Sequence, residues 1–246
     1  MNAQEDTFIS HLVELRDRLL RAVAAVIVVF VCLMPWAGDI YDILAHPMMQ
    51  ALPEGTRMIA TGVVTPFFVP MKVTLLVAFV IALPFVLYQA WCFIAPGLYA
   101  HEKRLGLPLV IGSTVLFLAG MAFCYFFVFG TVFRFISQFA PKSITPAPDI
   151  EQYLAFVMSM FLAFGVTFEV PVFVIVLVKL GVVDVAKLKE ARPYVIVGAF
   201  VVAAVLTPPD VVSQLMLAIP MCLLYELGIF LARFVTKTRA EEEVAG

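Results

Sequence analysis

The sequence has 246 residues, of which 63% are hydrophobic and 14% are charged. Soluble domains average about 45–50% apolar and about 25% charged residues, so this composition excludes an ordinary soluble protein and indicates a polytopic membrane protein. The formal net charge of −2 carries little information, because the charges are sorted by position along the chain.

The N-terminal segment, residues 1–21, predicts an amphipathic helix that leads into a first membrane span. Its apolar residues recur at helical spacing, at Phe8, Leu12, Leu15 and Leu19. The span itself is predicted at about 22–37. No small-x-small cleavage site closes this apolar run, so we expect it to stay in the protein as a span rather than be removed as a signal peptide.

Five further spans follow in the sequence. A loop at 38–66, with a short helix on the membrane surface, precedes the second span. The spans are predicted at about 69–94, 105–133, 152–180 and 194–207, and from 211 to the region of Glu226. Residues 194–207 cover only about 21 Å at 1.5 Å per residue. The last two spans therefore predict a short hairpin beside a concave flank.

Lysine and arginine gather in the N-terminal segment, in 95–104, in 179–193 and in the tail. By the positive-inside rule, this bias predicts that both termini are cytoplasmic. We expect one six-helix membrane domain over 1–232. The charged end, 233–246, predicts a disordered cytoplasmic tail.

One carboxylate, Glu169, lies in the middle of the apolar stretch 161–180. An ionisable group at that depth costs roughly 2.5–3.5 kcal/mol, so it usually faces protein or water and serves a function. Pro171 predicts a kink at the same point, because it removes a backbone N–H and clashes one turn back. We expect Glu169 to face the concave flank. The alternative is a glutamate that is protonated and hydrogen-bonded to a neighbouring helix for packing alone.

The chain shows no pattern of an enzyme or of a metal site. The four cysteines are far apart in apolar runs, and no CxxC occurs. His101 and Glu102 begin an HExxH pattern that Leu105 breaks, and no P-loop is present. We therefore expect no catalytic residues, no metal and no cofactor.

Four blocks of sequence resemble one known family. They are HLVELRDRLL at 11–20, FIAPGLYAHEKR at 93–104, FGVTFEVPV at 164–172 and RPYVIVGAFVVAAVLTPPD at 192–210. In these blocks, and over about 7–235 as a whole, the chain is similar to TatC, the multi-span signal-peptide receptor of the twin-arginine protein translocase. The resemblance implies six helices in a cupped shape with both termini cytoplasmic.

The resemblance also implies a set of site residues. A signal-peptide site would include Glu14, Arg16, Phe93, Glu102 and Lys103, of which Lys103 stands where the family often has arginine. A carboxylate can accept two parallel hydrogen bonds from a guanidinium, so Glu14 and Glu102 suit an arginine pair. For both acids, the alternative is a solvated surface position.

Further residues match positions of the family at the outer side of the membrane. The resemblance implies that Glu169 contacts a partner helix inside the membrane, and that Pro208, Asp210 and Gln214 dock partner helices. Asp210 before an apolar run also predicts a helix N-cap, which is compatible with docking. Pro47 would belong to an outer cap, or would only stiffen a loop.

The implied function is that of the core receptor of the twin-arginine translocase in the bacterial inner membrane. The implied partners are twin-arginine signal peptides, TatA- and TatB-type single-span proteins, the lipid bilayer and further copies of the chain, with no nucleic acid. Export of folded proteins would use the proton-motive force. The alternatives are a proton-coupled secondary transporter with Glu169 as its relay, which predicts further intramembrane acids and an internal repeat, and a passive membrane scaffold.

Overall fold

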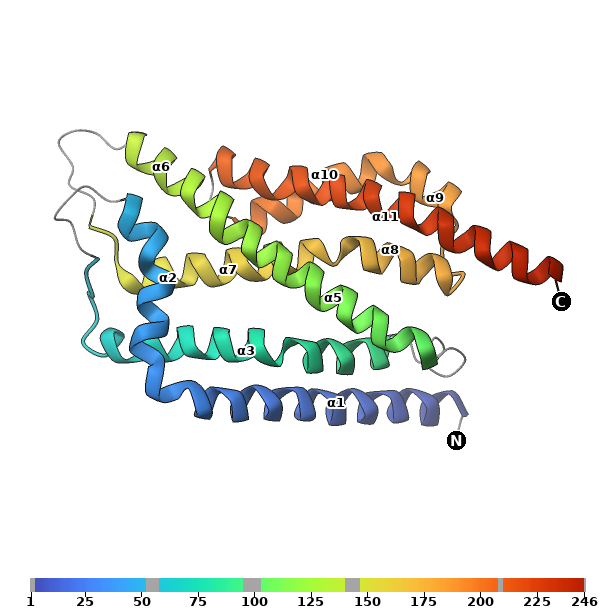
Figure 1. Ribbon diagram of the computed structural model, residues 1–246, viewed down its shortest axis with the longest axis horizontal. Helices are drawn as coiled ribbons and strands as arrows, with labels where there is room; N and C mark the ends of the chain where they lie inside the picture. The colour runs from blue at the N-terminus through green and yellow to red at the C-terminus, as the bar shows by residue number, and fades with distance from the viewer. Residues whose placement is uncertain (1–2, 52–57, 95–102, 140–146, 208–209, 246) are drawn as a thin grey trace. The chain divides into compact units, whose positions relative to one another are not determined.

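The computed structural model describes residues 3–51, 58–94, 103–139, 147–207 and 210–245. These residues form helices and their connections, with one isolated β-bridge between Ile59 and Asp149 (Figure 1). Five helical segments are long and apolar enough to cross a membrane, and they are His11–Pro47, Thr65–Ile94, Leu107–Ile136, Ile150–Lys179 and Val211–Phe234. A sixth apolar helix, Arg192–Leu206, is shorter. The all-helical membrane fold predicted from the sequence is confirmed.

The chain divides into two compact units. The first unit comprises residues 1–41 and 70–114. It holds α1 (Ala3–Leu33), the turn η1 (Met34–Trp36), most of α3 (Thr65–Ile94) and the first half of α5 (Lys103–Phe123). The amphipathic N-terminal segment and the first span are one continuous helix, α1, which ends immediately before the proline-containing turn.

Trp91 and Ser113 tie α3 to α5 within the first unit. The indole N–H of Trp91 donates to the hydroxyl of Ser113 at 2.8 Å, and both residues are buried. A buried indole N–H without an acceptor would cost about 1–3 kcal/mol. This bond therefore fixes the end of α3 against α5, close to Phe93.

The second unit comprises residues 42–69 and 115–246. It holds most of α2 (Ala37–Ala51) and the later part of the third span, in which a π-helical turn η2 (Cys124–Val128) leads into α6 (Phe129–Phe139). The remaining helices are α7 (Ile150–Phe168), α8 (Val170–Lys179), α9 (Val185–Glu190), α10 (Arg192–Leu206) and α11 (Val211–Ala245). The third span was predicted to end near 133, but its helix continues through α6.

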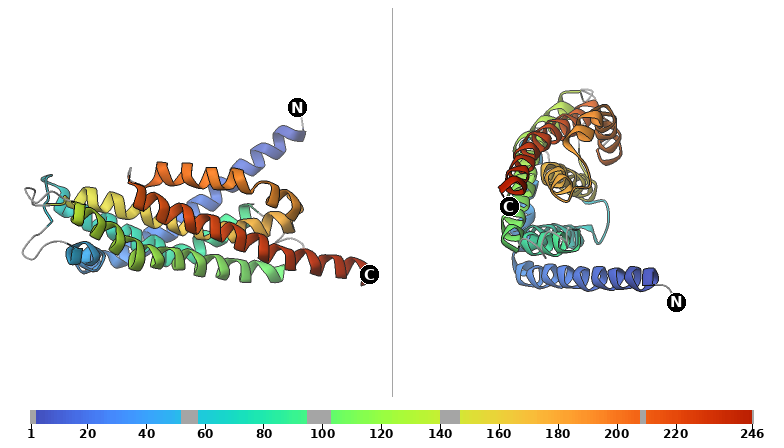
Figure 2. Two further views of the ribbon diagram at one scale, coloured as in Figure 1. Left: turned by 90° about the horizontal axis from the view of Figure 1, so that it is seen from above. Right: turned by 90° about the vertical axis from the view of Figure 1, so that its right-hand side faces the viewer.

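The core of the second unit is built where α7 and α8 pack against their neighbours. Val174, Val178, Tyr225 and Ile229 form one buried cluster between α8 and α11. Figures 1 and 2 show α10 and α11 side by side in the same unit. Because α8 is apolar on nearly every side, it can be covered by several helices at once.

The length of the last helix differs from the prediction. α10 has 15 residues and is short, as predicted. α11 begins at Val211, as predicted, but it has 35 residues and passes Glu226 without a break, so the expected short second arm of the hairpin is wrong. Glu226 pairs with Arg192 at 2.7 Å and is a good helix former, so its charge does not end the helix. Residues 233–245 are helical where the sequence predicts a disordered tail.

Candidate functional site

Glu14 lies on the polar face of α1, one turn before Arg18. Its Oε1 atom accepts two hydrogen bonds from the Arg18 guanidinium, from Nε at 2.8 Å and from Nη2 at 2.5 Å. The Glu14 side chain is 40% exposed and that of Arg18 is 24% exposed. Residues four apart on a helix face each other, which explains the pairing. The sequence predicted the polar face but not this pair.

Phe93, near the end of α3, lies against the same polar face of α1. Its ring stacks on that of His11 with the ring centroids 4.3 Å apart and an interplanar angle of 19°. His11 precedes Glu14 by three residues, so both side chains lie along one side of the helix. The structure therefore brings two of the predicted signal-peptide residues, Glu14 and Phe93, to one place.

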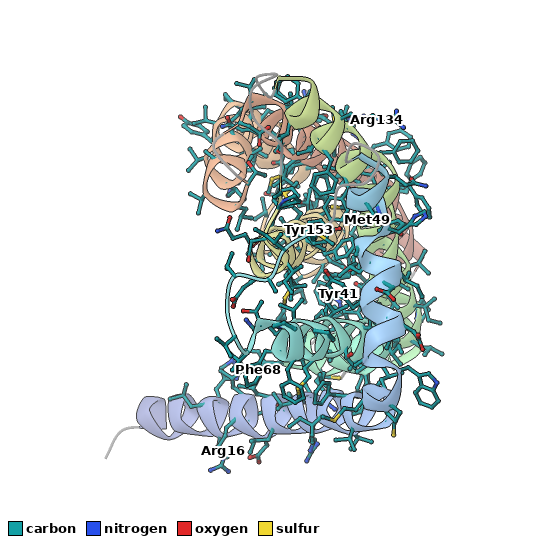
Figure 3. All side chains as sticks on the ribbon, turned by 90° about the vertical axis from the view of Figure 1, so that its left-hand side faces the viewer. Arg16, Tyr41, Met49, Phe68, Arg134 and Tyr153 are labelled. Carbon is teal, nitrogen blue, oxygen red and sulfur yellow. The ribbon has the colours of Figure 1, made fainter. Side chains whose placement is uncertain are left out.

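The other predicted members of this site are not brought there by the described structure. Arg16 lies on a different side of α1 (Figure 3), is largely exposed and pairs with Asp17 at 2.9 Å. Glu102 lies outside the described residues. Lys103 is the first residue of α5, but its side chain is outside the described part of the chain.

Glu169 occupies the break between α7 and α8. Its backbone forms the last cap of α7 and the first of α8, and Pro171 follows as the second residue of α8. The kink predicted from Pro171 is confirmed, since proline cannot donate the hydrogen bond that would continue α7. The residue is only 4% exposed. Glu169 therefore lies in the packed interior, and our expectation that it faces an open concave flank is wrong.

The helices around Glu169 pack closely. A Cβ placed on Gly228 of α11 would lie 3.0 Å from the Cα of Pro171, so the two backbones approach each other directly beside the break. Glu169 is the only Asp, Glu, Lys, Arg or His side chain that is buried in the described part of the chain. Burial of an ionisable side chain in such packing is costly unless the side chain is hydrogen-bonded or protonated.

Asp210 begins α11 as an N-cap. Its Oδ1 accepts a hydrogen bond from the backbone N–H of Ser213 at 2.7 Å, so the capping prediction is confirmed. One turn into α11, the side chain of Gln214 donates to the carbonyl of Phe200 in α10 at 3.2 Å. Pro208 lies outside the described residues. These contacts hold the ends of α10 and α11 together, and docking of partner helices there stays a prediction.

Pro47 lies inside α2, rather than in a loop. Proline has no N–H, so the carbonyl of Ile43, four residues earlier, loses its helical donor. Tyr125 supplies a replacement, because its hydroxyl donates to that carbonyl at 3.0 Å. Tyr153 donates to the next carbonyl, of Leu44, at 2.8 Å, and Figure 3 shows Tyr153 beside α2. Pro47 therefore leaves one carbonyl for a donor from the third span, and Tyr153 of the fourth span bonds the neighbouring carbonyl of the same helix.

Asp149 links the segment around Thr61 to the N-terminus of α7. Its Oδ2 accepts from the backbone N–H of Thr61 at 3.0 Å and from the Thr61 hydroxyl at 2.7 Å, and its Oδ1 caps α7. These hydrogen bonds, first that of the Thr61 side chain, lower the pKa of the Asp149 carboxyl. Among the described residues, no group of three or more His, Cys, Asp or Glu side chains could hold a metal ion.

Comparison with known proteins identifies the family of this chain. The family model "TatC: Sec-independent protein translocase protein (TatC)" matches residues 10–220. The chain belongs to the TatC family. It is a multi-pass inner-membrane protein of the Sec-independent, twin-arginine translocation system, and this family replaces the proton-coupled transporter as the interpretation of the sequence.

Individual TatC proteins are similar over nearly their full length. The Escherichia coli K12 protein is 52% identical, with 97% of this chain and 94% of the relative covered. The Aquifex aeolicus protein is 39% identical, with 96% and 98% covered. A crystal structure described as the twin arginine translocase receptor TatC is 40% identical and has a TM-score of 0.80, with 92% of this chain and 99% of that chain covered.

Residues that sequence analysis of this TatC chain missed are mainly those that position others. Arg18, Tyr125 and Thr61 were not singled out, although each holds a predicted or capping residue in place. The four-residue spacing of Glu14 and Arg18 was a visible signal. Nothing in the sequence indicated that Tyr125 or Thr61 would meet partners more than 80 positions away.

Proposed function

We propose that this chain is the core receptor of a twin-arginine translocase, which binds twin-arginine signal peptides and acts with TatA- and TatB-type proteins to export folded proteins. The supporting observation is the Glu14 carboxylate, held by Arg18 beside the stacked rings of His11 and Phe93. A carboxylate in that position already accepts a forked pair of hydrogen bonds from one guanidinium. It is suited to accept the same from an arginine of a peptide.

The exposure of the Glu14 carboxylate allows an arginine of a signal peptide to compete with Arg18 for it. Both bonds from Arg18 end on Oε1 of Glu14, and the carboxylate remains 40% exposed. A second guanidinium can therefore approach Oε2. Because Glu14 and Arg18 are partly exposed, their ion pair contributes only about 0.3–0.5 kcal/mol, and a peptide arginine can compete with it.

Phe93 gives the site an apolar wall. Stacked on His11, its ring offers a face to the stem of an arginine or to the apolar part of a signal peptide. Glu102 and Lys103, which follow Phe93 in the same block of sequence, would complete the site, with Glu102 as the second acceptor. Arg16 would act through the phosphate-rich membrane surface, since residues two apart on a helix, such as Glu14 and Arg16, do not face each other.

Partner proteins would contact the second unit. A polar side chain of a TatA-type single-span helix would contact Glu169 inside the membrane, as the resemblance to the family implies. The joined ends of α10 and α11, with Pro208, Asp210 and Gln214, offer a second docking place. Energy would come from the proton-motive force.

The decisive experiment measures binding of a fluorescent twin-arginine peptide to the chain in lipid nanodiscs. Changing Glu14 or Glu102 to glutamine should weaken binding about tenfold, as expected for the loss of one charge-assisted bidentate contact. Asp17→Asn is the matched control, because Asp17 lies on the same helix and pairs with Arg16 instead. Unchanged binding in both glutamate variants would remove the site. Equal weakening in Asp17→Asn would show that only net charge matters.

A further inference from the structure

An open groove runs along the outside of the third span in the second unit. It has a volume of about 470 Å³ and is lined by Phe126, Phe127, Gly130, Thr131, Arg134 and Phe135. These residues recur at spacings of four and five, so they lie on one side of η2 and α6. Phe126 and Phe127 are 73% and 64% exposed, while the opposite side of the helix, with Val128, Phe129 and Val132, is fully buried.

Two local features hollow this surface. The π-helical turn η2 shifts the register of side chains, and such turns are frequent at functional sites. Gly130 then leaves the floor without a side chain, and a Cβ placed there would meet no other atom within 4 Å. Thr131 donates its hydroxyl to the carbonyl of Phe127 at 2.8 Å, which keeps this polar group against the backbone.

The groove changes from apolar to cationic along its length. Arg134 lies two residues before the end of the apolar segment Leu107–Ile136, so its charge is at the level where hydrocarbon gives way to headgroups. Phe126 and Phe127 precede it by seven or eight residues, which places them about 10–12 Å deeper. Figure 3 shows Arg134 on the side of α6 that is turned away from α7, and the residue is exposed.

We propose that this groove binds one anionic phospholipid. Arg134 would hold the phosphate through its planar fork, and an acyl chain would lie over Gly130 against the rings of Phe126 and Phe127. Charge and depth select this occupant: a cation stands at headgroup level and exposed rings at acyl level on one face. The volume matches a single small-molecule site, whereas docking of a protein would bury an area well above 1,000 Å².

The test is native mass spectrometry of the full-length chain released from detergent with added phosphatidylglycerol or phosphatidylcholine. The first phosphatidylglycerol should bind with a Kd that rises about tenfold or more in Arg134→Gln, through loss of the charged contact. Gly130→Leu, which fills the floor, should raise it similarly. Lys72→Gln is the matched control, an exposed cation near one end of the second span, and it should change the Kd less than about twofold.

Several outcomes would overturn the proposal. Wild-type affinity in both Arg134→Gln and Gly130→Leu would remove the site, and equal affinity for phosphatidylcholine would remove the role of anionic charge. Efficient disulfide formation between two Phe126→Cys chains in phosphatidylglycerol nanodiscs would show that a second copy covers the groove instead. Should Gly130→Leu not fold, Phe126→Ala carries the same test, because a shortened acyl contact must also weaken binding.

Discussion

The hydroxyl of Tyr125 donates to the carbonyl of Ile43 at 3.0 Å, across 82 positions of sequence. That carbonyl is available because Pro47, four residues later in α2, has no N–H to give it. A proline that would ordinarily weaken a helix thus creates an acceptor for the third span. The pair explains why α2 can be attached to η2 through its backbone, and why a proline inside a helix is tolerated.

This relationship predicts that Tyr125→Phe lowers stability by about 0.5–1.5 kcal/mol, because the Ile43 carbonyl loses its donor. Pro47→Ala restores a helical N–H to the same carbonyl. The double variant should therefore lose less than the sum of the two single changes. Thermal unfolding in detergent measures this. Tyr194→Phe serves as the control, since Tyr194 is 79% exposed, and simple additivity would contradict the explanation.

Close helix packing predicts a strong response at two glycines. A Cβ on Gly120 would lie 2.5 Å from the backbone oxygen of Phe164, and one on Gly165 would overlap the ring of Phe117. Gly120→Ala should destabilise by about 1–3 kcal/mol, because a backbone atom must move. Gly198→Ala has open space and should be neutral or stabilising. Equal melting temperatures for the two variants would contradict this packing.

The lowered pKa of Asp149 predicts an acid-sensitive connection between Thr61 and α7. A carboxyl whose folded pKa is depressed adds stability above its unfolded pKa, and that stability is lost as pH falls through the folded pKa. Wild type should therefore be more stable than Asp149→Asn above about pH 4, with the difference disappearing at lower pH. Thermal unfolding between pH 2 and pH 7 tests this. A difference that grows on acidification would have the wrong sign.

Recognition by a fork of hydrogen bonds predicts that lysine cannot replace arginine in the signal peptide. Lysine keeps the charge but loses the planar arrangement of donors that Glu14 accepts from Arg18. A peptide with paired lysines should bind about tenfold more weakly than one with paired arginines. The ratio should shrink in Glu14→Gln, measured by the same fluorescence titration. A ratio unaffected by Glu14 would place recognition elsewhere.

The local features of this fold could be predicted from the sequence. Hydrophobic runs gave the spans, Pro171 gave the kink at Glu169, and the position of Asp210 before an apolar run gave its cap. Each of these depends on residues within one or two turns. The length of α11 could not be predicted from Glu226 alone, because Arg192 compensates its charge from another helix.

The site residues also combine features that could be predicted from the sequence with features that could not. Their identities followed from resemblance to the TatC family, but their surroundings depend on distant pairs such as Phe93 with His11. The exposure of Glu169 is the clearest case. A short hairpin suggested an open flank, whereas the longer α11 places Gly228 against Pro171, and residue Glu169 is 4% exposed.

Burial of Glu169 at the break between α7 and α8 leads to the last prediction. Glu169 belongs to a different compact unit from Glu14 and Phe93, the residues proposed to bind the peptide. Glu169→Ala should therefore leave the affinity for twin-arginine peptide unchanged. It should reduce transport of a folded precursor into inverted membrane vesicles by about tenfold or more, because a partner helix loses its polar contact inside the membrane. Glu169→Gln keeps hydrogen bonding without charge, so its transport rate should fall between those of wild type and Glu169→Ala.

Glu151→Gln is the control, because Glu151 is an exposed acid at the start of α7, and this variant should transport normally. Normal transport by Glu169→Ala would reject this role, and would leave the buried acid as a packing group of the kink.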